Sequence, residues 1–313
     1  MSKLAAGVLR WRRWLPWLAA LAILAFLVRE VRLDPLREAL RHGAWVALSA
    51  FIVLETILTL PADALGTREA LAAAGVDRPW IEVLLARGTS YLVGLVSYFA
   101  GQGGVGFYLA RTGVSVGRSA GAVLLLMIAN GIVLVVLGAV SLGIEIARGG
   151  LETANSDLLL LTVAAALAGT AAYLAVIAAR PPWLARYGLF APLFEAGIRG
   201  HLRSIAARFP HMLLLAALHW GAFRIWGIDV PLGRGLALNP VVLLIAALPV
   251  TPGGLGTTQA LQVLFFSPWS PAVSPDARAA DVLAFSLVHH MVGLLAQGAV
   301  GLACLLLLRR ERP

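Results

Sequence analysis

The chain has 313 residues, of which 60% are hydrophobic and only 13% are charged, and its net charge is +9. Soluble domains carry about 25% charged residues, so this composition excludes an ordinary soluble protein and predicts an all-α polytopic membrane protein. The basic residues flank apolar segments. The positive charge therefore points to membrane orientation and anionic lipid headgroups, and not to nucleic acid.

Several segments are long enough to cross a bilayer, which takes about 20 apolar residues. In chain order they lie at 11–28, 43–60, 119–147, 157–179, 205–228 and 281–308. Between them, 34–41 is predicted to be a short amphipathic helix at the interface. Two further apolar stretches, 80–100 and 236–250, lead directly into glycine-rich motifs. This gives eight apolar segments in all.

The motif Gly-Gly-x-Gly occurs twice, at 103–106 and 253–256. Glycine-broken apolar segments at corresponding places in two halves are typical of transporter binding sites between inverted repeats. We therefore expect a single transmembrane domain, residues 1–313. Its first pseudo-repeat, 1–150, would carry a re-entrant motif at 101–106, and its second, 151–313, one at 249–258.

The loop charges favour six spanning helices plus two opposed re-entrant hairpins. If both hairpins return to the side they enter, most basic residues fall on one side, which is cytoplasmic by the positive-inside rule; these loops are 1–13, 61–79, 107–118, 180–208 and 309–313. We expect both termini in the cytoplasm and the protein in the bacterial inner membrane. A bundle of eight spans is the alternative, but it would place the arginine-rich loop 180–208 outside.

The second motif predicts a helix that stops and restarts. Pro249 and Pro252 interrupt the incoming helix, and Thr257 or Thr258 can cap the next one, whose N-terminus would bind an anion. The first motif has the same layout with Gln102 in place of the prolines, while tight helix packing is the alternative for both. We expect substrate contacts from Gln102, Gly103, Gly104, Gly106, Arg111, Thr251, Pro252, Gly253, Gly254, Gly256, Thr257 and Gln259.

Charged residues inside apolar segments are costly, which makes them candidates for function. Arg87 and Arg224 could bind a lipid phosphate at two different depths in the membrane. The alternatives are that their side chains snorkel to the interface or that Arg87 forms a structural pair with Glu55. A gate or a proton-coupling role is the hypothesis for Glu55, Asp63, Arg68, Glu69, His219, His289 and His290. In the loop 61–79, a self-paired polar face is the simpler interpretation of Asp63, Arg68 and Glu69.

Neither a metal site nor a cofactor is expected. Cys304 is the only cysteine, so no cysteine-based metal site can form. His289 and His290 are adjacent and face different sides of a helix, which prevents them from binding one ion together. The sequence also contains no His-Glu-x-x-His, phosphate-binding P-loop or Gly-x-Ser-x-Gly motif, and we therefore do not expect an enzyme.

The run Pro252-Gly-Gly-Leu-Gly-Thr-Thr-Gln259 resembles a signature of the flippase-like integral membrane family, which includes the flippase domain of lysylphosphatidylglycerol synthases. The first motif is a weaker match, because the acidic residue common there is missing and only Arg111 follows. The resemblance covers nearly the whole chain and implies lipid translocation. Because no soluble aminoacyl-transfer domain is expected in this chain, lipid synthesis is not implied.

Together these features predict a transporter or flippase for an anionic amphipathic lipid, of the phospholipid or polyprenyl-phosphate type. Its partners would be membrane lipids, and a homo-oligomer or an association with a lipid-biosynthesis protein is possible. The alternative is a non-catalytic membrane partner of a lipid-modifying or envelope-assembly enzyme, which would retain the repeat as a scaffold.

Overall fold

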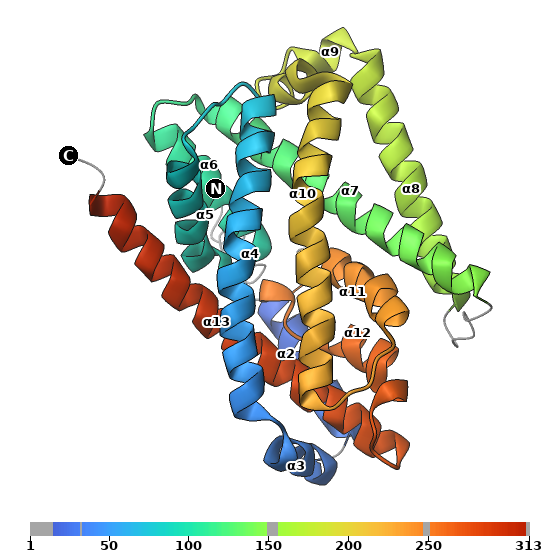
Figure 1. Ribbon diagram of the computed structural model, residues 1–313. Coiled ribbons are helices and arrows are strands. Elements are labelled where there is room, and N and C mark those ends of the chain that lie inside the picture. The colour runs from blue at the N-terminus through green and yellow to red at the C-terminus, as the bar shows by residue number, and fades with distance from the viewer. Residues whose placement is uncertain (1–14, 32, 149–155, 247–250, 311–313) are drawn as a thin grey trace, which may run out of the picture.

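The computed structural model describes residues 15–31, 33–148, 156–246 and 251–310, and all regular elements in these ranges are helices (Figure 1). The first half contains α2 (Leu15–Val31), α3 (Leu33–His42), α4 (Trp45–Ala73), α5 (Trp80–Gly94), α6 (Tyr98–Arg111) and α7 (Val116–Ala147). The second half contains α8 (Ser156–Ala179), α9 (Pro182–Ala185), α10 (Ala191–Trp226), α11 (Leu232–Ala246), α12 (Thr257–Phe266) and α13 (Pro275–Arg310), with the 3-10 turns η1 (Pro252–Gly254) and η2 (Ser267–Trp269).

Four of the described helices are long and apolar enough to cross a membrane, namely α4, α7, α8 and α13. They correspond to four of the six predicted spans and confirm a multi-pass membrane protein. The predicted span at 205–228 lies in the 36-residue α10, and the one at 11–28 lies partly outside the described residues. The predicted interfacial segment 34–41 is helical, as α3.

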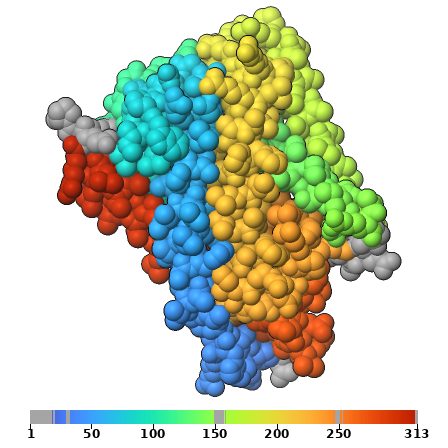
Figure 2. Space-filling model, in the orientation of Figure 1, coloured from blue at the N-terminus to red at the C-terminus, as the bar shows by residue number. Residues whose placement is uncertain are grey.

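The two central helices, α4 and α10, pack against each other over most of their lengths (Figures 1 and 2). Gly200 lies against Ala73, Gly66 against Arg208, and Gly221 against Phe51. Residue numbers rise along one helix as they fall along the other, so the two helices are antiparallel. Glycines at these contacts allow the close approach that helix packing in membranes requires.

A helical hairpin follows each of these long helices. In the first, α5 and α6 run antiparallel, with Gly94 against Gly101 near the turn and the Tyr108 hydroxyl donating to Glu82 Oε1 at 3.0 Å near the other end. The second is formed by α11 and α12. The helices of the first hairpin have 15 and 14 residues, and those of the second have 15 and 10. At 1.5 Å per residue they are all shorter than the bilayer core of about 30 Å.

The two hairpins start from opposite ends of the bundle. The connection 74–79 joins the end of α4 to α5, and 227–231 joins the end of α10 to α11. Because α4 and α10 are antiparallel, these ends lie at opposite ends of the molecule, as Figure 1 shows. In each half, therefore, a long helix is followed by a short hairpin and then by another long helix, α7 or α13.

Two predictions about helix ends were wrong. Pro61 does not end α4, which continues to Ala73. Asp63, Arg68 and Glu69 are therefore helical and do not belong to a loop at 61–79; proline is tolerated within membrane helices because the surrounding protein compensates for the lost hydrogen bond.

The first glycine motif also does not interrupt a helix. The chain turns at 95–97, where the Ser97 hydroxyl accepts a hydrogen bond from the Ala100 N–H at 3.1 Å. Gly104 and Gly106 lie inside α6, against Ser90 of α5 and Val123 of α7. Tight helix packing, the alternative interpretation, is what these two glycines provide.

Gly66→Ala tests the crossing of α4 and α10. A Cβ at this position would lie well inside contact distance of the Arg208 side chain, so Arg208 would have to leave its partner on α4. We expect a free energy of unfolding lowered by about 1–3 kcal/mol, measured by thermal denaturation in detergent.

Gly103→Ala is the matched control, because Gly103 is helical and an added Cβ meets nothing within 4 Å. It should leave stability unchanged or raise it by up to about 1 kcal/mol. Equal melting temperatures for the two variants would show that the crossing does not depend on close approach at Gly66.

Candidate functional site

A cavity of about 380 Å³ lies between the long helices and the two hairpins. The first hairpin contributes residues at its turn, including Gly94, Tyr98 and Gly101, and the second contributes Ala246, Gly253 and Thr258. The inner ends of both hairpins therefore meet at one cavity. Its wall is rich in polar side chains for so apolar a protein, among them Glu55, Thr56, Thr59, Asp63, Arg87, Ser90, Tyr91, Gln102, Asn130, His211, His219, His289, His290 and Gln297.

Asp63 is the centre of a buried ionic network at one end of the cavity. Its carboxylate accepts hydrogen bonds from Arg87 Nε at 2.8 Å, from Arg208 Nη1 at 2.6 Å and from the Tyr91 hydroxyl at 3.0 Å. Arg208 also contacts His211 Nδ1, at 3.0 Å. The network joins α4, α5 and α10, and its charged members are buried, so a charge left without its partner there would be costly.

The network carries an excess of positive charge, because two guanidinium groups share one carboxylate. Arg208 is fully buried, whereas Arg87 lines the cavity. Arg87 Nη1 donates to Gln102 Oε1 at 3.2 Å, and among the described residues Nη2 makes no hydrogen bond. The excess positive charge of the network therefore borders the cavity through Arg87, and a guanidinium group there can bind an anion bidentately or through water.

A second polar cluster lies nearer the N-terminal end of α4 and consists of Glu55, His219 and His289. His289 Nε2 is 3.4 Å from Glu55 Oε2, the rings of His219 and His289 are 4.5 Å apart, and the side-chain amide of Gln262 contacts His219 Nε2 at 2.7 Å. One donor atom from each of Glu55, His219 and His289 lies within 4.8 Å of the others. The adjacency of His289 and His290 is visible in the sequence, whereas the convergence of Glu55, His219 and His289 from three helices is visible only in the fold.

The second glycine motif forms the predicted break. Described residues of α11 end at Ala246, and α12 begins at Thr257. Gly253 and Gly254 have φ values of +59° and +75°, which only glycine adopts readily. The prediction of a threonine cap was wrong: Gly256 precedes the helix, and its N–H donates to Gln259 Oε1 at 2.6 Å. Pro249 lies outside the described residues.

The predicted site residues divide into two groups. Those that line the cavity are Glu55, Asp63, Arg87, Gln102, His219, Gly253, His289 and His290. Gln259 is buried as the helix cap, and Thr251 hydrogen-bonds to Thr257 at 3.0 Å. The predicted Glu55–Arg87 pair does not form, because Arg87 pairs with Asp63.

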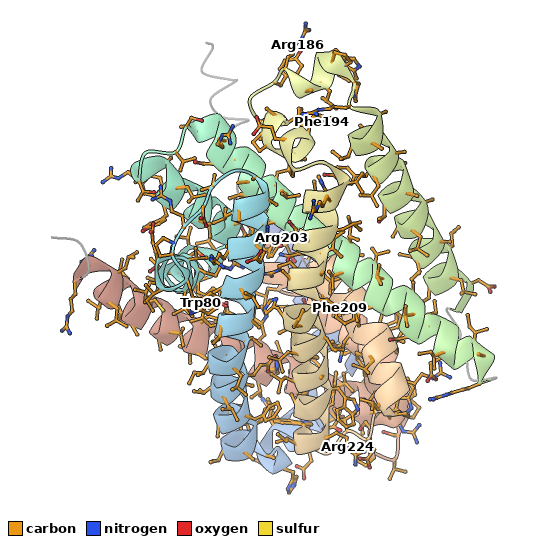
Figure 3. All side chains as sticks on the ribbon, turned by 45° about the horizontal axis from the view of Figure 1, so that its top comes forward. Trp80, Arg186, Phe194, Arg203, Phe209 and Arg224 are labelled. Carbon is orange, nitrogen blue, oxygen red and sulfur yellow. The ribbon has the colours of Figure 1, made fainter. Side chains whose placement is uncertain are left out.

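Other predicted residues lie away from the cavity. Arg224 is at the C-terminal end of α10, paired with Asp229 at 2.7 Å (Figure 3). Arg111 is exposed and lies over the Phe107 ring. Glu69 contacts Arg68 on its own helix and Arg203 of α10, at the surface. The Arg68–Glu69 contact agrees with the self-paired polar face, but Asp63 does not belong to such a face, because it is buried and pairs with Arg87 and Arg208. A gate at this place stays a prediction.

Sequence reasoning missed Arg208, which it counted among the basic residues of a cytoplasmic loop. The residue lies inside α10 with 0% of its surface exposed. A signal was present, since the predicted span already began at 205. The partner, Asp63, lies 145 positions away and could not be identified without the fold.

The chain matches a known family of membrane proteins. No curated protein matches the chain. The model of the family described as "Lysylphosphatidylglycerol synthase TM region" matches residues 13–301, which includes the residues that line the cavity, both hairpins and all the long helices except the last turns of α13. The chain therefore belongs to the family of the lysylphosphatidylglycerol synthase transmembrane region.

Proposed function

We propose that the protein is a flippase that moves an anionic amphipathic lipid across the bacterial inner membrane. The observation that carries the proposal is the Arg87 guanidinium, which faces the cavity from a network with more arginines than carboxylates. Membership in a family named after a lipid synthase's membrane region points to the same class of substrate. No catalytic step is proposed.

In this proposal the lipid phosphate binds at Arg87. Nη2 of Arg87 supplies a charge-assisted hydrogen bond, and Asp63 remains compensated by Arg208 when Arg87 turns toward the ligand. A cavity of about 380 Å³ is at the small end of the range for ligand pockets. It therefore suits a headgroup, with the acyl or prenyl chains remaining in the lipid.

The proposed architecture is an inverted repeat with two re-entrant hairpins. It is supported by the short hairpin helices, by their start at opposite ends of the antiparallel pair α4 and α10, and by the meeting of both turns at the cavity. Substrate sites between such repeats are typical of transporters that alternate between two accessible states. The first hairpin would enter from the cytoplasm and the second from outside, with both termini in the cytoplasm.

Arg87→Gln tests the phosphate contact. A hydrogen bond to a charged group contributes about 1.5–3 kcal/mol, so we expect lipid translocation about 10- to 100-fold slower. The measurement follows fluorescent phosphatidylglycerol in vesicles that contain the purified protein, with accessibility to an impermeant quencher as the readout.

Arg224→Gln is the matched control, since this arginine is half-exposed and paired with Asp229 outside the cavity. It should translocate the lipid at the wild-type rate. Thermal denaturation must show that both variants are folded. Wild-type transport by a folded Arg87→Gln variant would rule out the proposed phosphate site.

Single cysteines test the opposed hairpins. In a Cys304→Ser background, Asp77→Cys reports on the connection before the first hairpin and Asp229→Cys on the one before the second; both residues are exposed. An impermeant thiol reagent added to intact cells should label the second and should reach the first only after the membrane is permeabilised. Labelling of both from the same side would contradict the inverted arrangement.

A further inference from the structure

The cluster of Glu55, His219 and His289 contains no arginine to compensate its carboxylate, whereas the Asp63 network contains two. Asp63 is compensated by two arginines, whereas Glu55, 5% exposed, has only a histidine as its ionic partner among the described residues. A carboxylate buried in a membrane protein is costly unless a positive charge accompanies it. On one side of the cluster Phe285 packs against both histidine rings, and on the other side the cluster borders the cavity.

We propose that Glu55, His219 and His289 bind a divalent transition metal, with zinc as the best-fitting ion. Zinc binds histidine nitrogen and carboxylate oxygen at about 2.0–2.2 Å, which places two ligand atoms of a tetrahedral site about 3.3 Å apart. The Glu55 Oε2–His289 Nε2 distance is 3.4 Å. The third donor atom lies within 4.8 Å of both, so a small side-chain rotation completes the set.

The neighbours of the cluster fit a metal site. The side-chain amide of Gln262 lies 2.7 Å from His219 Nε2. With its oxygen turned to accept from the Nε2–H, it would leave Nδ1 free for the ion and fix the orientation of the ring. All three ligand residues line the cavity, so the fourth position of the metal would be open to it. Two nitrogen ligands favour zinc, cobalt, nickel or copper over magnesium or calcium, which prefer oxygen.

The ion would supply the positive charge that Glu55 lacks and would hold together α4, α10 and α13, the helices that carry the three ligands. The site does not depend on lipid transport. The proposal of a metal site is therefore independent of the proposed function, because its test measures the zinc bound per chain and not lipid translocation.

The test uses the full-length protein purified in detergent, stripped with a chelator and then dialysed against zinc chloride. We expect about one tightly bound zinc per chain by elemental mass spectrometry, and tetrahedral cobalt absorption after exchange with cobalt chloride. Glu55→Gln, His219→Asn and His289→Asn should each lower zinc affinity at least 100-fold in competition with a chelating dye, and Gln262→Ala about 10- to 100-fold.

His290→Asn is the matched control, because His290 neighbours His289 and lines the same cavity but is not among the three converging donors. It should bind zinc as the wild type does. Circular dichroism and size-exclusion chromatography establish that each variant is folded, and Glu55→Gln is nearly isosteric. Absence of stoichiometric zinc in the wild type, or zinc retained by folded Glu55→Gln and His289→Asn variants, would overturn the proposal.

Discussion

The Asp63 carboxylate holds three parts of the molecule together, because α4, α5 and α10 all depend on it for the compensation of buried charge. An isolated charge inside an apolar protein is far more costly than a paired one. If either arginine is removed, the other arginine still compensates the charge of Asp63. If Asp63 is removed, both guanidinium groups lose their counter-ion. The asymmetry explains why the carboxylate lies at the centre and the arginines at the periphery, one buried and one at the cavity.

The position of the first hairpin follows from the same constraint. Arg87 and Tyr91 are one helical turn apart on α5, and both donate to the same carboxylate oxygen of Asp63. They bring the inner half of α5 against α4, and Gly94 and Gly101 then allow α6 to return in close contact. The ion pair of the second hairpin lies away from the cavity, where Arg234 of α11 pairs with Glu145 of α7 at 3.0 Å. Its turn is shaped by the positive φ angles of Gly253, Gly254 and Gly256. The two hairpins thus reach one cavity by different means.

This difference explains what could be predicted from the sequence. The second break was predictable, because prolines and glycines in the order found at 249–256 leave few helical conformations. The first break was placed at the wrong residues, since the glycines at 101–106 could either interrupt a helix or pack against a neighbour, and only the fold decides which. The helix at 34–41 and the four long apolar helices followed from periodicity and hydrophobicity. The pairs Asp63–Arg208 and Glu55–His289 did not, because no local pattern links residues so far apart in the sequence.

The two clusters give the cavity an electrical polarity. Asp63 and Glu55 are eight residues apart on α4, about 12 Å along the helix axis, with Thr56 and Thr59 between them on the same cavity wall. The Asp63 end has an excess of arginine, whereas the Glu55 end has a carboxylate and histidines. A phosphate in the cavity is therefore attracted toward Arg87 and repelled from Glu55, unless a cation occupies the second cluster. Because Asp63 and Glu55 lie on a single continuous helix, α4 sets the direction of this polarity, and the anionic headgroup of the proposed substrate would be oriented along it.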